Sequence, residues 1–374
     1  MIYLDNAATT RPYERVVKRV TDVLTDSFGN PSSLHRLGME AEEIIKDARK
    51  TVASSIGAKE NEIFFTPSGT LANNTAILGY LRRNKHKGNQ VLISMVEHAS
   101  VYNIGKQLEK DGYQVAWIPI VNGEPDWTFL EEHLNRDVAL VSMMAVNNET
   151  GTLFDIKRIK QMMMAKAPNA VLHSDCIQAY GKLDIHVRDF GADLMSFSGH
   201  KIGAPKGIGA LYVKKGILLE SLYYGGGQED NLFSGTENVA NIAAFSEAVK
   251  IFKEEHPIEK IKQLSELFLS LLAEEIPVNS QHSFGTIVNI SLNLRSEIVL
   301  HMLERDGIYV SSGSACSEKK GGNNRVLAAF SVPKAMQDTA IRVSFSANNT
   351  EEEVRFAAEK INQIFKMNQK NKKN

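Results

Sequence analysis

Apolar and polar positions alternate in blocks through the first two thirds of the chain. Between about residues 60 and 215, short apolar runs are separated by amphipathic segments. The apolar runs cover residues 62–66, 90–95, 138–146, 170–175 and 193–199, and the amphipathic segments cover residues 71–83, 101–110 and 156–166. This alternation is typical of strand–helix units and predicts a largely parallel sheet, and therefore an α/β fold.

After about residue 255 the pattern changes to long charged helices and a few short strands. The apolar strands of this part are expected at residues 285–292, 309–313 and 341–346. The last helix is expected to begin near Thr350, because Thr350 and Glu353 have the spacing of a capping box. The sequence therefore predicts a large domain over residues 15–255 and a smaller α+β domain formed by residues 1–14 and 256–374.

Composition and charge argue against several classes of protein. A net charge of -1 over 374 residues leaves no broad positive surface for nucleic acid or for an acidic membrane. No apolar run approaches the ~18 residues that a membrane-spanning helix needs. The two cysteines cannot form a disulfide framework, and residues 1–10 have neither the basic nor the apolar region of a secretion signal. We therefore expect a soluble protein of the reducing cytoplasm that binds neither nucleic acid nor a membrane directly.

Chemically useful residues lie at the ends of the predicted strands, where ligands of α/β proteins bind. Ser198, His200 and Lys201 lie at the end of one strand, before a glycine-rich return into the next. A lysine beside apolar or cationic groups has a lowered pKa and can form a Schiff base with an aldehyde, although a surface lysine in a turn is the simpler interpretation. The glycines do not form a nucleotide loop, because neither GxxxxGKS/T nor GxGxxG after a strand occurs.

Other strand ends supply the remaining parts of one cofactor site. Asp175 ends a strand, where a carboxylate can keep a pyridine nitrogen protonated or can simply cap a helix. The amide of Asn147 or Asn148 can donate to a phenolate oxygen, although NN followed by a glycine also suits an ordinary turn. Gly69 and Thr70 open a helix whose N-terminus can bind a phosphate, and His98 can stack on a planar ring, transfer protons or be structural. Together with the lysine, these residues predict a pyridoxal phosphate pocket.

Cys316 is one of the two cysteines and lies in the segment SSGSACSEKKGGNNR, residues 311–325. The glycines, charges and amides that follow it predict a solvent-facing loop rather than a buried core position. Lys319, Lys320 and Arg325 would favour the thiolate, which is the nucleophilic form of the side chain. The segment therefore predicts a reactive thiol, with an incidental loop cysteine as the alternative.

With these residues in view, the chain resembles the cysteine desulfurases, within the class V aminotransferase group of fold-type I pyridoxal phosphate enzymes. The resemblance runs almost from end to end in the family's order, and SFSGHK together with SSGSAC is highly specific. The blocks are YLDNAATT, FGNPSSLHRLG, EH at residues 97–98, VNNETG, DxxQ at residues 175–178, SFSGHK, SGTEN, SSGSAC and IRVSFS. The resemblance implies a mainly parallel seven-stranded sheet in the large domain and a smaller domain that carries the cysteine loop.

The resemblance also implies a role for each matching residue. Lys201 would hold pyridoxal phosphate as a Schiff base, and Arg342, together with Asn148, would bind the substrate. The other cofactor contacts would be Asp175 at the pyridine nitrogen, Asn148 and Gln178 at the phenolic oxygen, Gly69, Thr70, Ser198 and His200 at the phosphate, and His98 on the ring, where it could also transfer protons. Thr236 would reach the phosphate in another subunit, which implies a homodimer with shared active sites. No metal is implied.

The reaction implied by the resemblance begins when L-cysteine displaces Lys201 from the cofactor. Cys316 would then attack the substrate sulfur, giving L-alanine and a persulfide on Cys316. A mobile loop would carry that sulfur to a protein acceptor for iron–sulfur cluster assembly or for thiolation of tRNA or cofactors. Alternatives with the same fold are a selenocysteine lyase or a cysteine sulfinate desulfinase. An alternative of another class is an inactive sulfur-carrier scaffold.

Several positions differ from the family's usual pattern. Pro67 and Leu71 are unusual in the phosphate-binding stretch, and they leave cofactor affinity open. Asp230 and Phe233 stand near positions where relatives usually have arginines, which leaves the docking of an acceptor open. Cys176 replaces a small residue beside the strand-end aspartate, and we interpret it as buried packing without a catalytic role.

Overall fold

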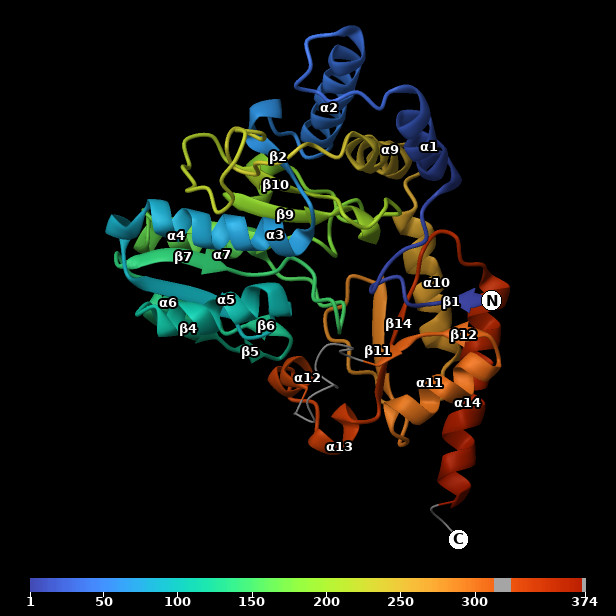
Figure 1. The fold of residues 1–374 in the computed structure, drawn as a ribbon. Helices are drawn as coiled ribbons and strands as arrows, with labels where there is room; N and C mark the ends of the chain where they lie inside the picture. Colours follow the sequence, from blue (N-terminus) through green and yellow to red (C-terminus); the bar gives the residue numbers. More distant parts are fainter. Residues whose placement is uncertain (313–323, 372–374) are drawn as a thin grey trace.

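A sheet of seven strands, all within the described residues 1–312 and 324–371, forms the centre of the larger part of the molecule (Figure 1). In this computed structural model the order across the sheet is β2 (Ile63–Thr66), β10 (Gly209–Val213), β9 (Leu194–Ser198), β8 (Val171–Asp175), β7 (Val138–Ser142), β3 (Gln90–Ser94) and β4 (Gln114–Ile118). β10 runs antiparallel to both of its neighbours, and the other adjacent pairs are parallel. The predicted α/β fold with a mainly parallel sheet is confirmed.

Each face of this sheet has its own apolar core, because successive strand residues point to opposite faces. In β10, for example, Ala210 and Tyr212 belong to one core and Leu211 belongs to the other. The first core includes residues of α1 (Glu14–Asp26), α2 (Arg36–Ser55), α6 (Trp127–His133), α7 (Ile156–Lys166) and α9 (Val239–Glu255). The second core includes residues of α3 (Gly69–Asn74), the π-helical turn Thr75–Gly79, α4 (Tyr80–Arg83) and α5 (Ala99–Lys110).

A second, smaller unit is built around an antiparallel sheet of β11 (Ile287–Ser291), β14 (Ala340–Ser344) and β13 (Ser311–Ser312). Its apolar core includes residues of α10 (Ile258–Leu271), α11 (Ser296–Arg305) and α14 (Glu351–Asn371). The predicted capping box is present at the start of α14. There the Thr350 backbone N–H donates to Glu353 Oε2 and the Glu353 backbone N–H donates to Thr350 Oγ1, both at 3.3 Å.

The N-terminus joins the two units. β1 (Ile2–Tyr3) pairs with β12 (Ile308–Tyr309) in the smaller unit, and Asp5 forms a bridge with Ser344. The chain then crosses to the larger unit, where the Thr10 backbone N–H donates to His200 O at 2.8 Å. We call residues 3–10 the N-terminal strap, because this segment lies at the junction that carries the site described below.

Two short helices follow the segment 313–323, which lies outside the described residues. They are α12 (Arg325–Ala329) and α13 (Lys334–Gln337). Val326 and Leu327 of α12 pack in the first core of the large sheet rather than in the core of the smaller unit. The domain boundaries at residues 14/15 and 255/256 stay a prediction. In the structure α12, which belongs to the second half of the chain, packs on the larger unit.

The remaining short elements are the hairpin of β5 (Ile120–Val121) and β6 (Glu124–Pro125), the helix α8 (Val187–Phe190), and the 3-10 turns Glu60–Glu62, Lys85–Lys87 and Gly199–Lys201. Within the described ranges, no helix combines the length and the apolar character needed to cross a membrane.

Candidate active site

A cavity of about 630 Å³ opens where the parallel strands end and the N-terminal strap crosses between the units. Ten of the predicted site residues line it: Gly69, Thr70, His98, Asn148, Asp175, Gln178, Ser198, His200, Lys201 and Arg342. Thr236 is exposed and is not among the lining residues of this single chain. Cys316 lies outside the described residues. The cavity is large enough for a cofactor and a small substrate together.

Lys201 ends the turn that follows β9, and its Nζ is held by the N-terminal strap. Nζ donates to Ala7 O at 2.5 Å and to Ala8 O at 2.7 Å. Burial, and then the positive charges of Arg342 and Lys182, lower the pKa of Lys201 to about 7, while the carboxylates of Asp5 and Asp175 oppose this shift. Near neutral pH a large fraction of this amine is therefore uncharged and able to act as a nucleophile.

This lowered pKa predicts the pH dependence of Lys201 labelling in the protein without cofactor. Only the uncharged amine reacts with an amine-specific reagent, so the labelling rate of Lys201 should rise with pH, reach half its maximum near pH 7 and level off above about pH 8. An ordinary lysine, whose pKa is about 10.4, should continue to gain reactivity well above that pH. Peptide mass spectrometry after labelling measures both. A Lys201 profile that still rises through pH 10 would show that the buried environment does not lower the pKa.

Asp175 ends β8, and its carboxylate accepts two hydrogen bonds at the edge of the cavity. Its Oδ2 accepts from Asn73 Nδ2 at 2.8 Å, and its Oδ1 accepts from the Ile177 backbone N–H at 2.9 Å. Burial raises the pKa of Asp175, and His98, the two hydrogen bonds and Lys201 oppose the shift. Since both donors stabilise the charged form, Asp175 is suited to pair with a cationic ring nitrogen.

His98 and Glu97 follow β3 on the same side of the cavity. His98 caps α5, with its Nδ1 2.8 Å from Ser100 Oγ, and burial lowers its pKa. The Glu97 carboxyl is fully buried, and its Oε1 accepts from the Met144 backbone N–H at 2.7 Å, while no described residue donates to Oε2. Burial, and then the charge of Asp175, raise the pKa of Glu97 well above its usual value. The hydrogen bonds to Asp175 favour its charged form, whereas burial and the charge of Asp175 favour the protonated form of Glu97.

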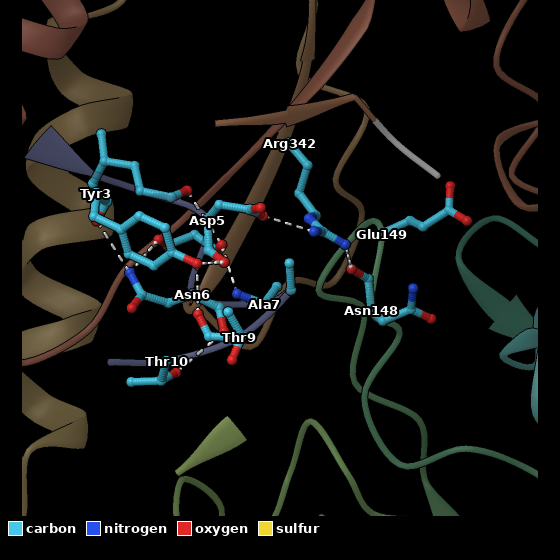
Figure 2. Close-up of polar contacts among 12 residues, drawn as sticks. Tyr3, Asp5, Asn6, Ala7, Thr9, Thr10, Asn148, Glu149 and Arg342 are labelled. Carbon is cyan, nitrogen blue, oxygen red and sulfur yellow. Dashed lines mark hydrogen bonds and ion pairs between the residues drawn. The ribbon is translucent and has the colours of Figure 1, made fainter. Parts of the chain in front are cut away.

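Arg342, on β14 of the smaller unit, reaches into the cavity between the strap and the loop after β7 (Figure 2). Its Nη2 donates to Asp5 Oδ1 at 2.9 Å, and its Nη1 donates to the backbone carbonyl of Asn148 at 2.8 Å. Gln178 is anchored on the strap as well, because its Nε2 donates to Ala7 O at 2.9 Å. The strap thus contacts four of the predicted site residues, which are Gln178, His200, Lys201 and Arg342.

The start of α3 fits the predicted phosphate site in its backbone geometry. A Cβ atom on Gly69 would lie 2.3 Å from Ile177 Cδ1 and 3.2 Å from Ser198 Cβ, so only glycine lets this helix approach the ends of β8 and β9 so closely. Ser68 caps the helix by accepting from the Leu71 backbone N–H at 3.2 Å. The other groups of the cavity fit the same cofactor. Pyridoxal phosphate requires an amine, a carboxylate and an anion site such as a helix N-terminus, and the cavity offers all three.

Residues that depart from the family pattern have clear local environments. Phe233 is buried and stacks on Tyr223, with ring centroids 5.2 Å apart. Asp230 has a positive φ of 53° and follows Glu229, which forms a bidentate ion pair with Arg49. Cys176 is fully buried, and burial raises the pKa of its thiol, so it is a packed and unreactive thiol in this fold.

Several residues of the cavity carry no predicted role. Among them are the strap residues Asp5, Ala7 and Ala8, together with Glu97 and Glu149. The blocks YLDNAATT, EH and VNNETG contain all five, but the order of the blocks does not show that the strap meets the ends of β8 and β9. The sequence predicts that Arg325 favours the thiolate of Cys316. In the structure its guanidinium donates to the backbone carbonyls of Met95 and Glu97 and lies 4.0 Å from the centre of the Tyr102 ring.

The fold and the cavity together define a pyridoxal phosphate-dependent enzyme of fold type I. A family model described as aminotransferase class-V matches residues 2–356. A NifS/IcsS protein homolog of Lactobacillus delbrueckii subsp. bulgaricus is 39% identical over 363 residues, which are 94% of each chain. A putative cysteine desulfurase IscS 1 of Bacillus subtilis is 36% identical over 375 residues, which are 98% of each chain. The chain therefore belongs to the class V aminotransferase family and, within it, to the cysteine desulfurases.

Solved structures agree with this assignment. A structure described as a NifS-like protein superposes with a TM-score of 0.92 at 31% identity and covers 98% of this chain and 99% of its own. A structure described as SspA in complex with cysteine superposes with a TM-score of 0.83 at 30% identity and covers 94% of this chain and 100% of its own. The enzyme class, the fold type and the use of pyridoxal phosphate, all expected from the sequence, are confirmed.

Proposed function

We propose that this enzyme removes sulfur from L-cysteine, giving L-alanine and a persulfide on Cys316. The observation that supports it most directly is the cavity itself, where the amine of Lys201, the carboxylate of Asp175 and the guanidinium of Arg342 converge from both units. The related structure in complex with cysteine supports the choice of substrate.

Pyridoxal phosphate, when bound, accepts into its ring the electron pair left when the substrate Cα–H bond breaks. Lys201 would hold the cofactor and, once displaced by the substrate amine, would carry the Cα proton. Asp175 would keep the ring nitrogen protonated, and His98 would stack on the ring and exclude water from it. The other expected contacts are Asn148 and Gln178 at the phenolic oxygen, and Gly69, Thr70, Ser198 and His200 at the phosphate.

Arg342 would orient the substrate through its carboxylate, and Cys316 would take its sulfur. In that step the Cys316 thiolate forms a bond to the substrate sulfur and the substrate C–S bond breaks. The electron pair of the broken C–S bond stays with the amino acid fragment, which gains protons to become L-alanine. The sum is L-cysteine plus an enzyme thiol giving L-alanine plus an enzyme persulfide, so no external oxidant or reductant is needed.

The cellular setting is also part of the proposal. The exposed position of Thr236 suits a homodimer in which this residue reaches the phosphate site of another subunit. The acceptor would be a protein that passes the sulfur to iron–sulfur cluster assembly or to thiolation of tRNA or cofactors. The scarcity of cysteine and the need for a free thiol fit the reducing cytoplasm.

The purified protein, loaded with pyridoxal phosphate, tests this function directly. It should release alanine from L-cysteine, and its rate on L-cysteine should fall when Cys316 is replaced, because sulfur removal depends on that thiol. Rates on selenocysteine and cysteine sulfinate measure the alternatives. A faster rate on either of these substrates, unchanged in Cys316→Ala, would contradict the desulfurase assignment. Absence of cofactor absorbance, with acceptor binding retained, would favour the inactive scaffold.

A further inference from the structure

The guanidinium of Arg342 already has a carboxylate partner that belongs to the chain itself. Asp5 Oδ1 lies 2.9 Å from Arg342 Nη2, and both residues line the cavity. The side chain of Arg342 is 7% exposed and that of Asp5 is 21% exposed, so the pair is largely shielded from water. Figure 2 shows Arg342 between Asp5 on one side and Asn148 on the other, with Glu149 beyond.

The position of Asp5 is fixed by the rest of the N-terminal strap. Tyr3 Oη donates to the backbone carbonyls of Asp5 at 3.2 Å and Thr9 at 2.8 Å. The next residue, Asn6, donates through Nδ2 to Ser344 O at 2.9 Å, which ties the strap to β14, the strand of Arg342. The contact between Asp5 and Arg342 therefore joins two segments that other hydrogen bonds hold in place.

The charge of Asp5 matters because Lys201 lies near two other basic side chains. The positive charges of Arg342 and Lys182 lower the pKa of Lys201, and Asp5 and Asp175 are the carboxylates that oppose this shift. Asp175 accepts hydrogen bonds from Asn73 and from the Ile177 backbone. Asp5 forms an ion pair with Arg342, and a buried guanidinium without this partner would hold any anion tightly.

We propose that Asp5 is the internal counter-ion of Arg342, which keeps the guanidinium in place before substrate enters and weakens the hold on carboxylates so that the product can leave. Substrate and product carry the same α-carboxylate, so an uncompensated Arg342 would retain both. Asp5 shares the guanidinium with the incoming carboxylate and thereby limits this affinity. The inference rests on the proposed role of Arg342 as the anchor of the substrate carboxylate.

The test compares L-alanine binding to the cofactor-loaded protein with and without the Asp5 charge. Binding is measured by titrating L-alanine and recording the change in the absorption band of the cofactor. Asp5→Asn keeps the size and an acceptor oxygen but removes the charge, and it should lower the dissociation constant of L-alanine by about tenfold. Asp5→Glu restores the carboxylate and should return the constant toward the wild-type value. Glu351→Gln removes the carboxylate of an exposed pair with Arg355 in the same unit and serves as the matched control.

A second measurement needs neither substrate nor cofactor. Because the Asp5 carboxylate raises the pKa of Lys201, Asp5→Asn should move the midpoint of Lys201 labelling to a lower pH in the protein without cofactor. Arg342 and Lys182, which lower this pKa, and Asp175, which raises it, remain in place in that variant. An unchanged midpoint would show that Asp5 does not act on this cluster of charges, and it would overturn the counter-ion role.

Arg342→Gln separates this inference from the function on which it rests. Loss of L-alanine binding in Arg342→Gln together with tighter binding in Asp5→Asn supports both. Loss in Arg342→Gln without tighter binding in Asp5→Asn overturns the role of Asp5 and leaves the anchor role intact. Unchanged binding in Arg342→Gln overturns the anchor role, and the counter-ion role with it.

Discussion

Lys201→Ala should lower alanine release from L-cysteine by about 10³-fold or more, because the variant loses both the group that holds the cofactor and the group that moves the Cα proton. The geometry supports this single assignment, since Lys201 Nζ lies at the floor of the cavity between the strap and the end of β9. The variant should also lose covalently held cofactor. Borohydride reduction followed by peptide mass spectrometry locates the attachment site in the wild-type protein.

Lys182 offers a matched control for this experiment. It is also buried, burial lowers its pKa to about 8, and its Nζ lies 3.5 Å from Gln178 Oε1. Lys182→Gln should still carry the cofactor on Lys201 after reduction. Attachment to Lys182 in the wild-type protein, or a cofactor that stays covalently bound in Lys201→Ala, would show that the wrong amine has been assigned.

Cys316→Ala should keep the absorbance of the bound cofactor and lose sulfur transfer. The variant should bind pyridoxal phosphate as the wild type does, because all residues assigned to hold the cofactor remain, but its transfer of sulfur to an acceptor should fall by about 10³-fold or more, as expected for loss of a covalent nucleophile. Sulfide released in the presence of a small dithiol measures the transfer, and absorbance of the cofactor measures the colour. Cys176→Ala is the control, because Cys176 is a fully buried thiol, and it should retain transfer. A normal transfer rate in Cys316→Ala would contradict the assignment of the nucleophile.

The sheet and much of the cavity could be predicted from sequence because both follow from local patterns. Apolar runs identify parallel strands, and polar residues directly after those runs must meet at one edge of the sheet. Asp175, Ser198 and Lys201 were found in this way, and all three line the cavity. Arg342 has no such signal, because it lies within a strand of the smaller unit, and only the resemblance to the family identified it.

The contributions of the N-terminal strap could not be predicted, because they depend on contacts between residues more than 160 positions apart. Ala7 O accepts hydrogen bonds from both Lys201 and Gln178. Every residue type has a backbone carbonyl, so the identity of residue 7 does not indicate this role. The raised pKa of Glu97 could not be predicted either, since it results from complete burial next to Asp175 rather than from its neighbours in sequence. Packing of α12 on the large sheet, away from the core of its own half of the chain, is another long-range outcome.

The most direct test of the central claim follows the sulfur atom itself. The wild-type protein is mixed with a limiting amount of L-cysteine that carries a heavy sulfur isotope, the thiols are alkylated, and the peptides are analysed by mass spectrometry. The account predicts that the isotope appears as a persulfide on the peptide containing Cys316, with one alanine formed for each persulfide. Alanine formed without isotope on Cys316, or isotope found on Cys176 instead, would contradict it.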